Sequence, residues 1–582
     1  MSTIAAISYP PPEPRFLPAD FDATDTSQIE ARFDELQQRP LEDVAALRAW
    51  IADVDELIAA MSAVESRGRI AASVDTTDEA ARAALIDFQT RVLPVRKRGA
   101  AALDKRFVEC PHRAELDAGT WGVFDRFKRA EQELFREANV ALETEESRLA
   151  LRYDELMGGL SVTFRGEQYT PQAMARFLEE HDRDTRREAW TASANARMAV
   201  SEEVETVLDQ LLSLRGEMAA NADCVDYREF RFRQLHRFDY SPAECEEFHA
   251  AVEQHVVPAV NALRERRRRA LGVDQLCPWD LAVDPEGKPP LRPFADVAEL
   301  SDMCETAFTR VDPELGAQFA FMREHDLLDL ANRPGKAPGG YQATPADTRL
   351  PFIFANSVGL MNDVRTLLHE GGHAFHALAC RDQPVADYRH APIEFCEVAS
   401  MSMELLGAEQ YEAVMSAEDA VRARSQQLHR SLELLPWVAT VDAFQHWLYT
   451  HPGHGHDERR EAWIALRERF EPGLDWTGHE DWYGLEWQRQ LHLYKVPFYY
   501  IEYGIAQVGA LQVWLNWRNK GAPALAAWRE ALALGGSRPL PDLFTAAHVC
   551  FDFGPAMLQT LCAAVMESID ECESGLAQAG PA

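Results

Sequence analysis

Two histidines and a glutamate form the pattern HExxH inside an apolar stretch, TLLHEGGHAFHAL, residues 366–378. Apolar residues on both sides of the motif favour a buried helix. Residues four apart lie about one turn of ~3.6 residues apart on the same helix face, so His369 and His373 can bind one metal ion together. Glu370 lies beside them, where it could take a proton from a water whose pKa a zinc ion lowers to about 7. The chain must therefore build a fold around one buried, metal-binding helix.

A catalytic zinc site usually has three protein ligands and one open position, so a third ligand is expected elsewhere in the chain. HAPIEFCEVASMSMELL, residues 390–406, predicts a second helix with an apolar face that carries Glu394, Glu397 and Glu404. A carboxylate on such a face needs a partner, because burying an unpaired charge is costly. Glu397 and Glu404 are two turns apart and share a face, with Glu394 close by. Spacing alone does not choose among the three, and Glu394 is equally compatible with a solvated helix charge.

Two glycines, Gly371 and Gly372, interrupt the metal-binding helix. Each costs a helix interior about 1 kcal/mol relative to alanine. Close packing of a neighbouring element would explain them. We expect that element to be the helix over residues 390–406.

The rest of the chain predicts a mostly α protein. Apolar residues recur at helical spacing in long stretches, strand-like runs are few, and 582 residues exceed the size of a single core, so two helical lobes are expected. We expect an N-terminal helical lobe over residues 1–195, with the first 18 or so residues extended, and a catalytic domain over residues 196–582. LSVTFRGEQYT predicts a hairpin around Arg165 and Gly166. A small sheet is expected near the metal.

The order of residues in the second motif resembles that of a known protein family. Phe395, Glu397, Ser400 and Glu404 stand in the order F-x-E-x-x-S-x-x-x-E, which follows the zinc helix in the thimet oligopeptidase and oligoendopeptidase F metallopeptidases. Among these the Pz-peptidase-like bacterial members are the most similar. The resemblance covers most of residues 150–570. It implies Glu397 as the third zinc ligand and Glu404 as a residue that orients a ligand histidine, the support that metal-bound imidazoles usually have.

A tyrosine-rich segment near the C-terminus, QLHLYKVPFYYIEYGIAQVGA, continues the resemblance. In the family a histidine and tyrosines point over the zinc, and His492, Tyr500 and Tyr503 fall in the corresponding places. A phenol or imidazole donor there would stabilise the oxyanion of a tetrahedral intermediate. Function is favoured for Tyr503, and Tyr500 is equally compatible with function and with a core position. Tyr494 and Tyr499 are interpreted as core residues.

Upstream of the zinc helix, GKAPGGYQATPADTRLPFIFANSVG predicts a Gly/Pro-rich turn and a short apolar strand over residues 351–355. The family places an edge strand here, to which an extended peptide can add through main-chain hydrogen bonds. The turn is expected to be a flexible substrate loop. The residues expected to contact substrate are Gly339, Gly340, Tyr341, Phe354 and Ala355.

Composition restricts the partners and the compartment. The formal net charge of -35 repels phosphate backbones and makes nucleic-acid binding unlikely. No window holds 18 uncharged apolar residues and the N-terminus lacks a signal-like pattern, so no membrane span and a cytoplasmic location are expected. The ten cysteines form no CxxC pair and are expected to be reduced. THPGHGHDERR, residues 450–460, is interpreted as a loop with exposed histidines and no carboxylate or thiol frame for a second metal.

Together these features predict a zinc-dependent metalloendopeptidase with one Zn²⁺ per chain, ligated by His369, His373 and Glu397, with Glu370 as general base. The resemblance implies two helical lobes around a deep central channel, a zincin-like core, short peptides as substrates and exclusion of folded proteins. A zinc carboxypeptidase or dipeptidyl carboxypeptidase would share the ligands but need a positive group for the substrate C-terminus. A non-catalytic peptide-binding protein is disfavoured, because every catalytic position is filled. Both a monomer and a homodimer fit the sequence.

Overall fold

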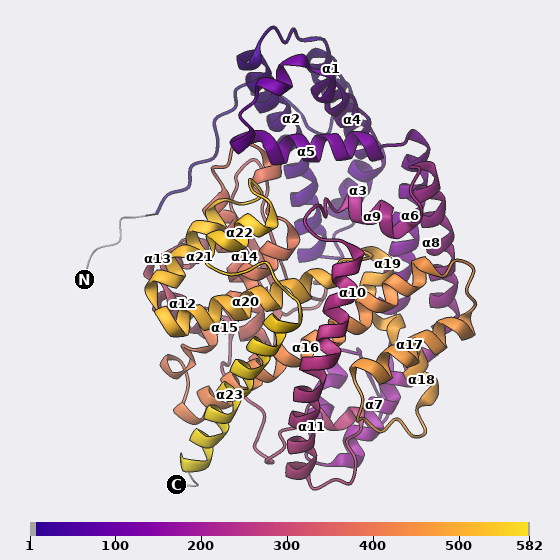
Figure 1. Ribbon diagram of the computed structural model, residues 1–582, viewed down its shortest axis with the longest axis vertical. Coiled ribbons are helices and arrows are strands. Elements are labelled where there is room, and N and C mark those ends of the chain that lie inside the picture. Colours follow the sequence, from indigo (N-terminus) through magenta and orange to yellow (C-terminus); the bar gives the residue numbers. More distant parts are fainter. Residues whose placement is uncertain (1–6, 580–582) are drawn as a thin grey trace.

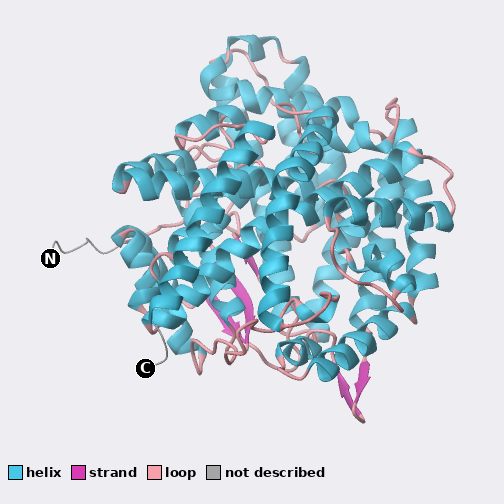
Figure 2. Cartoon of the chain, turned by 60° about the horizontal axis from the view of Figure 1, so that its bottom comes forward, coloured by secondary structure: helices cyan, strands magenta, loops and turns pink. Residues whose placement is uncertain are grey.

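The computed structural model describes residues 7–579 and is built almost entirely of helices (Figure 2). The expected mostly α fold is confirmed. The Pro-rich start at residues 7–14 carries no regular secondary structure, whereas residues 1–6 of the predicted extended segment lie outside the described residues. No described helix combines the length and the apolar character that crossing a bilayer requires.

The N-terminal helices lie together at the top of the molecule in Figure 1. They surround a hydrophobic core of their own, formed by side chains such as Phe33, Trp50 and Phe107. Tyr388, from the 3-10 turn η6 (Ala386–Tyr388) far along the chain, joins this core and donates a hydrogen bond to the carbonyl oxygen of Thr120 at 2.7 Å. These helices are α1 (Thr26–Gln38), α2 (Val44–Val74), α4 (Leu93–Glu109) and α5 (Ala118–Leu134). Two further helices of this region lie lower in the figure: α3 (Glu79–Asp87), which buries no side chain, and α6 (Glu137–Gly158), whose buried apolar side chains belong to the larger C-terminal core.

The predicted hairpin is confirmed as β1 (Val162–Phe164) and β2 (Glu167–Tyr169), paired antiparallel. Arg165 and Gly166 form its two-residue turn with φ of 50° and 87°. Both residues adopt the left-handed conformation that such tight hairpins require. The helices that follow are α7 (Arg183–Met198), α8 (Ser201–Asn221), α9 (Tyr227–Gln234), α10 (Pro242–Ala251), α11 (Val257–Leu271), α12 (Val297–Val311) and α13 (Pro313–Glu324).

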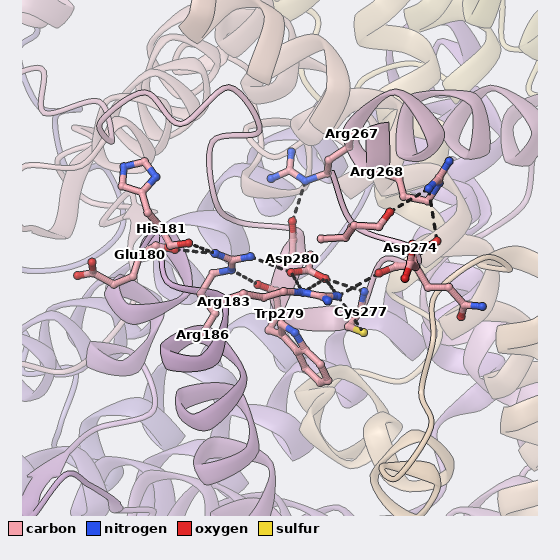
Figure 3. Close-up of polar contacts among 12 residues, drawn as sticks. Glu180, His181, Arg183, Arg186, Arg267, Arg268, Asp274, Cys277, Trp279 and Asp280 are labelled. Atoms are coloured by element: carbon pink, nitrogen blue, oxygen red, sulfur yellow. Dashed lines mark hydrogen bonds and ion pairs between the residues drawn. The ribbon is translucent and has the colours of Figure 1, made fainter. Parts of the chain in front are cut away.

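A buried ion cluster fastens α7 to the 3-10 turn η5 (Pro278–Asp280), as Figure 3 shows. The Asp280 carboxylate is fully buried and accepts hydrogen bonds from Arg186 Nη2 at 2.8 Å and from Arg183 Nη2 at 2.7 Å. A buried carboxylate is tolerated here because two guanidinium groups compensate its lost hydration.

The large C-terminal core is centred on three stacked helices, α14 (Met361–Cys380), α15 (Ile393–Ala408) and α20 (Tyr500–Lys520). A side chain at Gly372 of α14 would meet Ser400 Cα of α15 at 2.6 Å, and one at Gly371 would meet the Phe308 ring at 2.5 Å. The expected close approach of the second motif helix is thus confirmed for Gly372, while Gly371 makes room for α12. The other helices are α16 (Ala417–Thr450), α17 (His456–Phe470), α18 (Glu480–Leu485), α19 (Leu491–Lys495), α21 (Ala522–Ala533), α22 (Leu540–Ala546) and α23 (Pro555–Ala579).

A three-stranded sheet lies beside α14, in the order β3-β5-β4. β5 (Phe352–Ser357) pairs parallel with β3 (Leu328–Ala331) and antiparallel with β4 (Tyr341–Ala343). The prediction of a strand at residues 351–355 is confirmed, but its place as the edge strand is wrong, because β5 is the central strand. The two outer strands are β3 and β4, and the edge that lines the cavity is that of β4, formed by the segment interpreted as a turn.

The predicted domain boundary at residue 195 stays a prediction. Leu134 already belongs to the large core, together with residues as distant in sequence as Cys572. None of the ten cysteines forms a disulfide, as expected.

Candidate metal centre and active-site cavity

The helix α14 presents His369 and His373 on one face, one turn apart, with ring centroids 4.9 Å from each other. Glu397 of α15 faces both rings: its Oε2 lies 3.4 Å from His369 Nε2 and 3.7 Å from His373 Nε2. One ligand atom from each of the three residues lies within 4.8 Å of the others. The close contact at Gly372 positions this geometry, since it sets α15 directly against the motif helix.

This donor set fits a divalent metal ion. Two imidazole nitrogens and one carboxylate oxygen are the ligands that catalytic zinc sites use, and all three side chains line one cavity, from which a fourth ligand could approach. The Glu397 carboxylate accepts neutral hydrogen bonds from Ser400 Oγ at 3.0 Å and from Tyr499 Oη at 3.3 Å. Burial raises the pKa of Glu397, in spite of the nearby His369. A bound cation would offset that desolvation cost.

Glu404 supports the site from behind. Its Oε1 lies 2.8 Å from His369 Nδ1, and Gln427 Nε2 donates to its Oε2 at 2.9 Å. An acceptor at Nδ1 holds the imidazole in the tautomer whose Nε2 lone pair is free for a metal. Burial alone would raise the pKa of Glu404, but the hydrogen bond and the charge of His369 lower it overall.

Glu370 faces the same cavity and is only 7% exposed. Burial raises the pKa of Glu370 to about 7, a shift that the neighbouring His369 opposes. A carboxyl group with a pKa near neutrality can both accept and return a proton at physiological pH.

The cavity has a volume of about 770 Å³ and follows α14 from His369 to Arg381. Strand β4 forms one wall, the loop and start of α15 another, and Ser62 of the N-terminal helix α2 also lines it. Of the expected substrate contacts, Gly340 and Tyr341 line the cavity.

The other three expected contacts are placed elsewhere. Gly339, Phe354 and Ala355 are not among the residues that line the cavity. Phe354 is covered because it lies on the central strand, where the Tyr341 ring stacks on it at 4.8 Å. The turn before β4 was expected to be a flexible loop, but hydrogen bonds hold it to β5. Asn356 Nδ2 donates to the carbonyl oxygens of Ala337 at 2.7 Å and Gly339 at 2.9 Å.

Among the C-terminal tyrosines, Tyr503 lines the cavity and Tyr494 is buried in the core against Tyr153. Tyr500 does not line the cavity, and its hydroxyl accepts a hydrogen bond from Trp437 Nε1 at 2.8 Å. Tyr499 was interpreted as core, yet it lines the cavity and donates to Glu397. Its position one residue before Tyr500 gave no local signal of that contact.

His492 stands behind the tyrosines rather than in the cavity wall. Its ring packs edge-on to Tyr500 at 4.8 Å and to Tyr503 at 5.8 Å. It can therefore orient Tyr503, and burial lowers the pKa of His492 to about 4, which keeps the ring neutral.

Glu394, the third candidate of the second motif, is buried and belongs to a separate cluster. Tyr240 donates to its Oε1 at 2.6 Å, and Arg237 approaches it to 4.0 Å while pairing with Glu502 at 2.7 Å. It is neither a solvated charge nor one of the three residues around the metal centre.

The interpretation of residues 450–460 is corrected by the structure. A carboxylate frame does lie beside the loop, because α8 brings Asp209 to 2.7 Å and Glu205 to 3.9 Å from His456 Nε2. The guanidinium of Arg459 pairs with both carboxylates and occupies the place of a cation.

Comparison with known proteins shows which family has similar sequences and structures. The family model "Peptidase family M3" matches residues 176–562, and "Peptidase M3 N-terminal domain" matches residues 16–144. Oligopeptidase PepF of Bacillus subtilis (strain 168) is 22% identical over 478 residues, which cover 77% of this chain and 68% of that protein. The solved structure of Pz peptidase A with an inhibitor is similar at a TM-score of 0.89 and 28% identity, over 96% of this chain and 99% of that one. The solved structure of a protein provisionally named oligoendopeptidase F is similar at a TM-score of 0.89 and 29% sequence identity. The match covers 95% of this chain and 98% of that one.

A helical scaffold that brings two histidines and two glutamates together along one cavity, with a third glutamate behind one histidine, is typical of a metallopeptidase. The chain belongs to peptidase family M3, since the family model spans well over half of its length. The predicted resemblance to the oligoendopeptidase F type is confirmed.

Proposed function

We propose that this enzyme is a zinc-dependent endopeptidase that hydrolyses internal bonds of short oligopeptides. The observation that carries the proposal is the convergence of His369, His373 and Glu397 beside the cavity-facing Glu370. The relatives named oligopeptidase and oligoendopeptidase support the substrate class.

His369, His373 and Glu397 would hold the zinc ion. When bound, the ion supplies Lewis-acid polarisation of the peptide carbonyl and acidifies a water molecule. Glu370 removes the proton of the attacking water and returns it to the departing amine, a role that fits its pKa of about 7. The phenol of Tyr503 donates a hydrogen bond to the developing oxyanion, while Tyr499 holds Glu397 in place.

Substrate binding is assigned to the free edge of β4. An extended peptide can add to this edge through main-chain hydrogen bonds, which read no side-chain sequence. Burial raises the pKa of Glu370, and the backbone amide of Gln342, in the same strand, lowers it slightly, so the strand that would bind the peptide also lies beside the proposed base.

The general base is tested with Glu370→Gln, which keeps the shape of the side chain and removes its proton-accepting oxygen. We expect the variant to retain one zinc per chain and to lose most of its turnover, by about 10²-fold or more. Zinc is counted by mass spectrometry and turnover is followed on an internally quenched peptide. Full activity in this variant would refute the assignment of Glu370.

A carboxypeptidase action is the second candidate, and one observation favours it. Three arginines line the cavity, so the positive group that such an enzyme needs for the substrate C-terminus exists. Peptides blocked at both ends separate the two reactions. Cleavage of internal bonds in blocked peptides supports the endopeptidase, whereas release of C-terminal residues only from unblocked peptides supports the alternative.

A further inference from the structure

The cavity changes character along its length. Near the metal centre its ionisable side chains are His369, His373, Glu370 and Glu397, but beyond His373 they are three arginines and two histidines. Among the described residues that line this far end there is no carboxylate. In a chain with a net charge of -35, three guanidinium groups at one end of a cavity are unexpected. The two histidines there are neutral donors or acceptors, because burial lowers the pKa of both. The five residues are Arg349, Arg381, Arg389, His376 and His390, which we call the basic end of the cavity.

Arg349 is the guanidinium of the basic end with the most free donors. Among the described residues no carboxylate lies within ion-pair distance of it, and its side chain makes one hydrogen bond, from Nη1 to the carbonyl oxygen of Arg381 at 2.9 Å. Its Nε is buried without any partner. Arg349 also has φ of 55°, a left-handed conformation that costs an L-residue about 1–2 kcal/mol. A strained backbone thus presents a cation with unused donors to the cavity.

The other two arginines are held by protein groups. Arg389 pairs with Asp55 of α2 at 2.7 Å and donates to the carbonyl oxygen of Gln383 at 2.9 Å. Arg381 donates to the carbonyl oxygen of Pro10 at 2.9 Å and lies 3.6 Å from the Asp382 carboxylate. Burial lowers the pKa of Arg349; the charges of Arg389 and Arg381 lower it further, whereas those of Asp55 and Asp382 raise it. Arg389 and Arg381 thus each have a carboxylate partner, and Arg349 is the guanidinium that a bound anion would pair with.

Two imidazoles complete the basic end. His376 is 3% exposed and its Nε2 has no hydrogen-bond partner, which is uncommon for a buried polar atom. Nδ1 of His390 lies 2.8 Å from the carbonyl oxygen of Ala391, which leaves Nε2 free. His390 is exposed, yet desolvation lowers its pKa, as expected for a side chain that borders water inside a walled cavity. Both rings can therefore contribute hydrogen bonds to a ligand.

The basic end lies at a defined distance from the metal centre. His373, His376, Ala377 and Cys380 line the cavity from one face of α14. Seven positions separate His373 from Cys380. At a rise of about 1.5 Å per residue they span about 10 Å, and an extended peptide covers that distance with about three residues of about 3.3 Å. The hydrogen bond from Arg349 Nη1 to the carbonyl oxygen of Arg381 places the Arg349 guanidinium at that end of the helix.

We propose that Arg349, with Arg389, His376 and His390, forms a subsite for a peptide carboxylate about three residues from the scissile bond. This inference rests on the proposed peptidase function and adds a preference to it. A guanidinium group recognises a carboxylate through paired, charge-assisted hydrogen bonds. The carboxylate comes either from the substrate C-terminus or from an aspartate or glutamate side chain. Each source gives the same chemistry at Arg349.

The experiment compares matched peptides by kcat/KM, with cleavage sites located by mass spectrometry. One pair differs only in a C-terminal acid or amide three residues after the cleaved bond. Two further pairs are blocked at both ends and carry glutamate or glutamine as the third residue on either side. We expect at least one carboxylate member to be cleaved about tenfold faster or more than its neutral partner, the effect of one lost charged hydrogen bond. The pair that shows the preference identifies the source.

Variants connect the preference to this subsite. In Arg349→Gln, the ratio of kcat/KM between the carboxylate peptide and its neutral partner should fall close to one. Arg349→Lys should restore part of the preference, because lysine supplies a positive charge but cannot form the paired hydrogen bonds of arginine. The control Arg148→Gln removes an exposed arginine on α6, and its ratio should stay at the wild-type value. The comparison of carboxylate and neutral peptides is made on the wild-type enzyme. It therefore tests the inference even if Arg349→Gln does not fold.

Two different failures are distinguishable. If neutral peptides are cleaved in a chelator-sensitive reaction but all acid and amide partners are cleaved equally, the carboxylate subsite is refuted and the peptidase stands. If no peptide is cleaved, the proposed function itself fails. A preference that survives Arg349→Gln unchanged would overturn the assignment of the subsite to this arginine.

Discussion

At the scale of single residues, the site depends on how each ligand is held. His369 has partners at both ring nitrogens, Glu404 at Nδ1 and Glu397 at Nε2. Glu404 is itself held by Gln427. These contacts hold the imidazole in an orientation suited to metal binding. They therefore reduce the conformational entropy that the side chain would lose when a metal binds.

The variant Glu404→Gln should weaken zinc binding by about 10–100-fold, because the amide cannot match the carboxylate as an acceptor for His369. Competition with a chromophoric chelator measures the change. The matched control is Glu412→Gln, whose side chain is 59% exposed and lies away from the metal centre. Equal zinc affinities in wild type and Glu404→Gln would contradict the role given to Glu404.

At the scale of elements, the site depends on the distance between α14 and α15. Their backbones approach at Gly372, where no side chain fits against Ser400 and Ala399. Because the two proposed ligand histidines are on α14 and the proposed ligand glutamate is on α15, this contact sets the spacing of the three candidate ligand atoms. We expect the helix-breaking cost of the glycine to be offset by the placement of Glu397.

We expect Gly372→Ala to lower stability by about 1–3 kcal/mol through overpacking and to weaken zinc binding as α15 is displaced. The control is Gly216→Ala on α8, where an added Cβ meets nothing within 4 Å. That change should stabilise the helix by about 0.5–1 kcal/mol. Thermal unfolding and zinc titration of both variants test this, and unaltered zinc affinity in Gly372→Ala would argue against the spacing role.

At the scale of the whole molecule, the deep cavity affects how stability depends on pH. Burial lowers the pKa of His376 to about 3, compared with 6.5 for an ordinary histidine. Between these values the unfolded chain binds a proton at this residue and the folded chain does not. Stability from this group is therefore complete above about pH 6.5 and decreases as the pH falls towards 3.

In metal-free protein, His376→Gln should lose less stability than wild type when the pH is lowered from 7 to 5. The difference is at most about 1.4 kcal/mol per pH unit within this range. Urea midpoints at several pH values report it, with exposed His451→Gln as the control that should follow the wild type. Identical acid sensitivity in wild type and His376→Gln would contradict a neutral buried His376.

Local spacing was sufficient for part of this protein. His369, Glu370 and His373 are neighbours in the chain, so the helical period alone brings them to one site. Glu397 and Glu404 required the family resemblance to choose between them, although their shared face was already evident. Tyr499 and the edge strand β4 were missed, because the contact of one and the free edge of the other depend on how distant segments pack.

The sequence by itself determined the helical architecture, the helix that carries His369 and His373, and the place of the proposed base Glu370 beside them, because periodicity, charge and motif spacing are properties of short segments. Tertiary structure alone decided which strand has a free edge, which tyrosine reaches Glu397 and which arginines meet at the end of the cavity. Arg349 and Arg389 are separated by 40 positions in the chain yet face one cavity. Contacts between residues so far apart in the chain depend on how side chains pack between elements. No local pattern in the sequence indicates them.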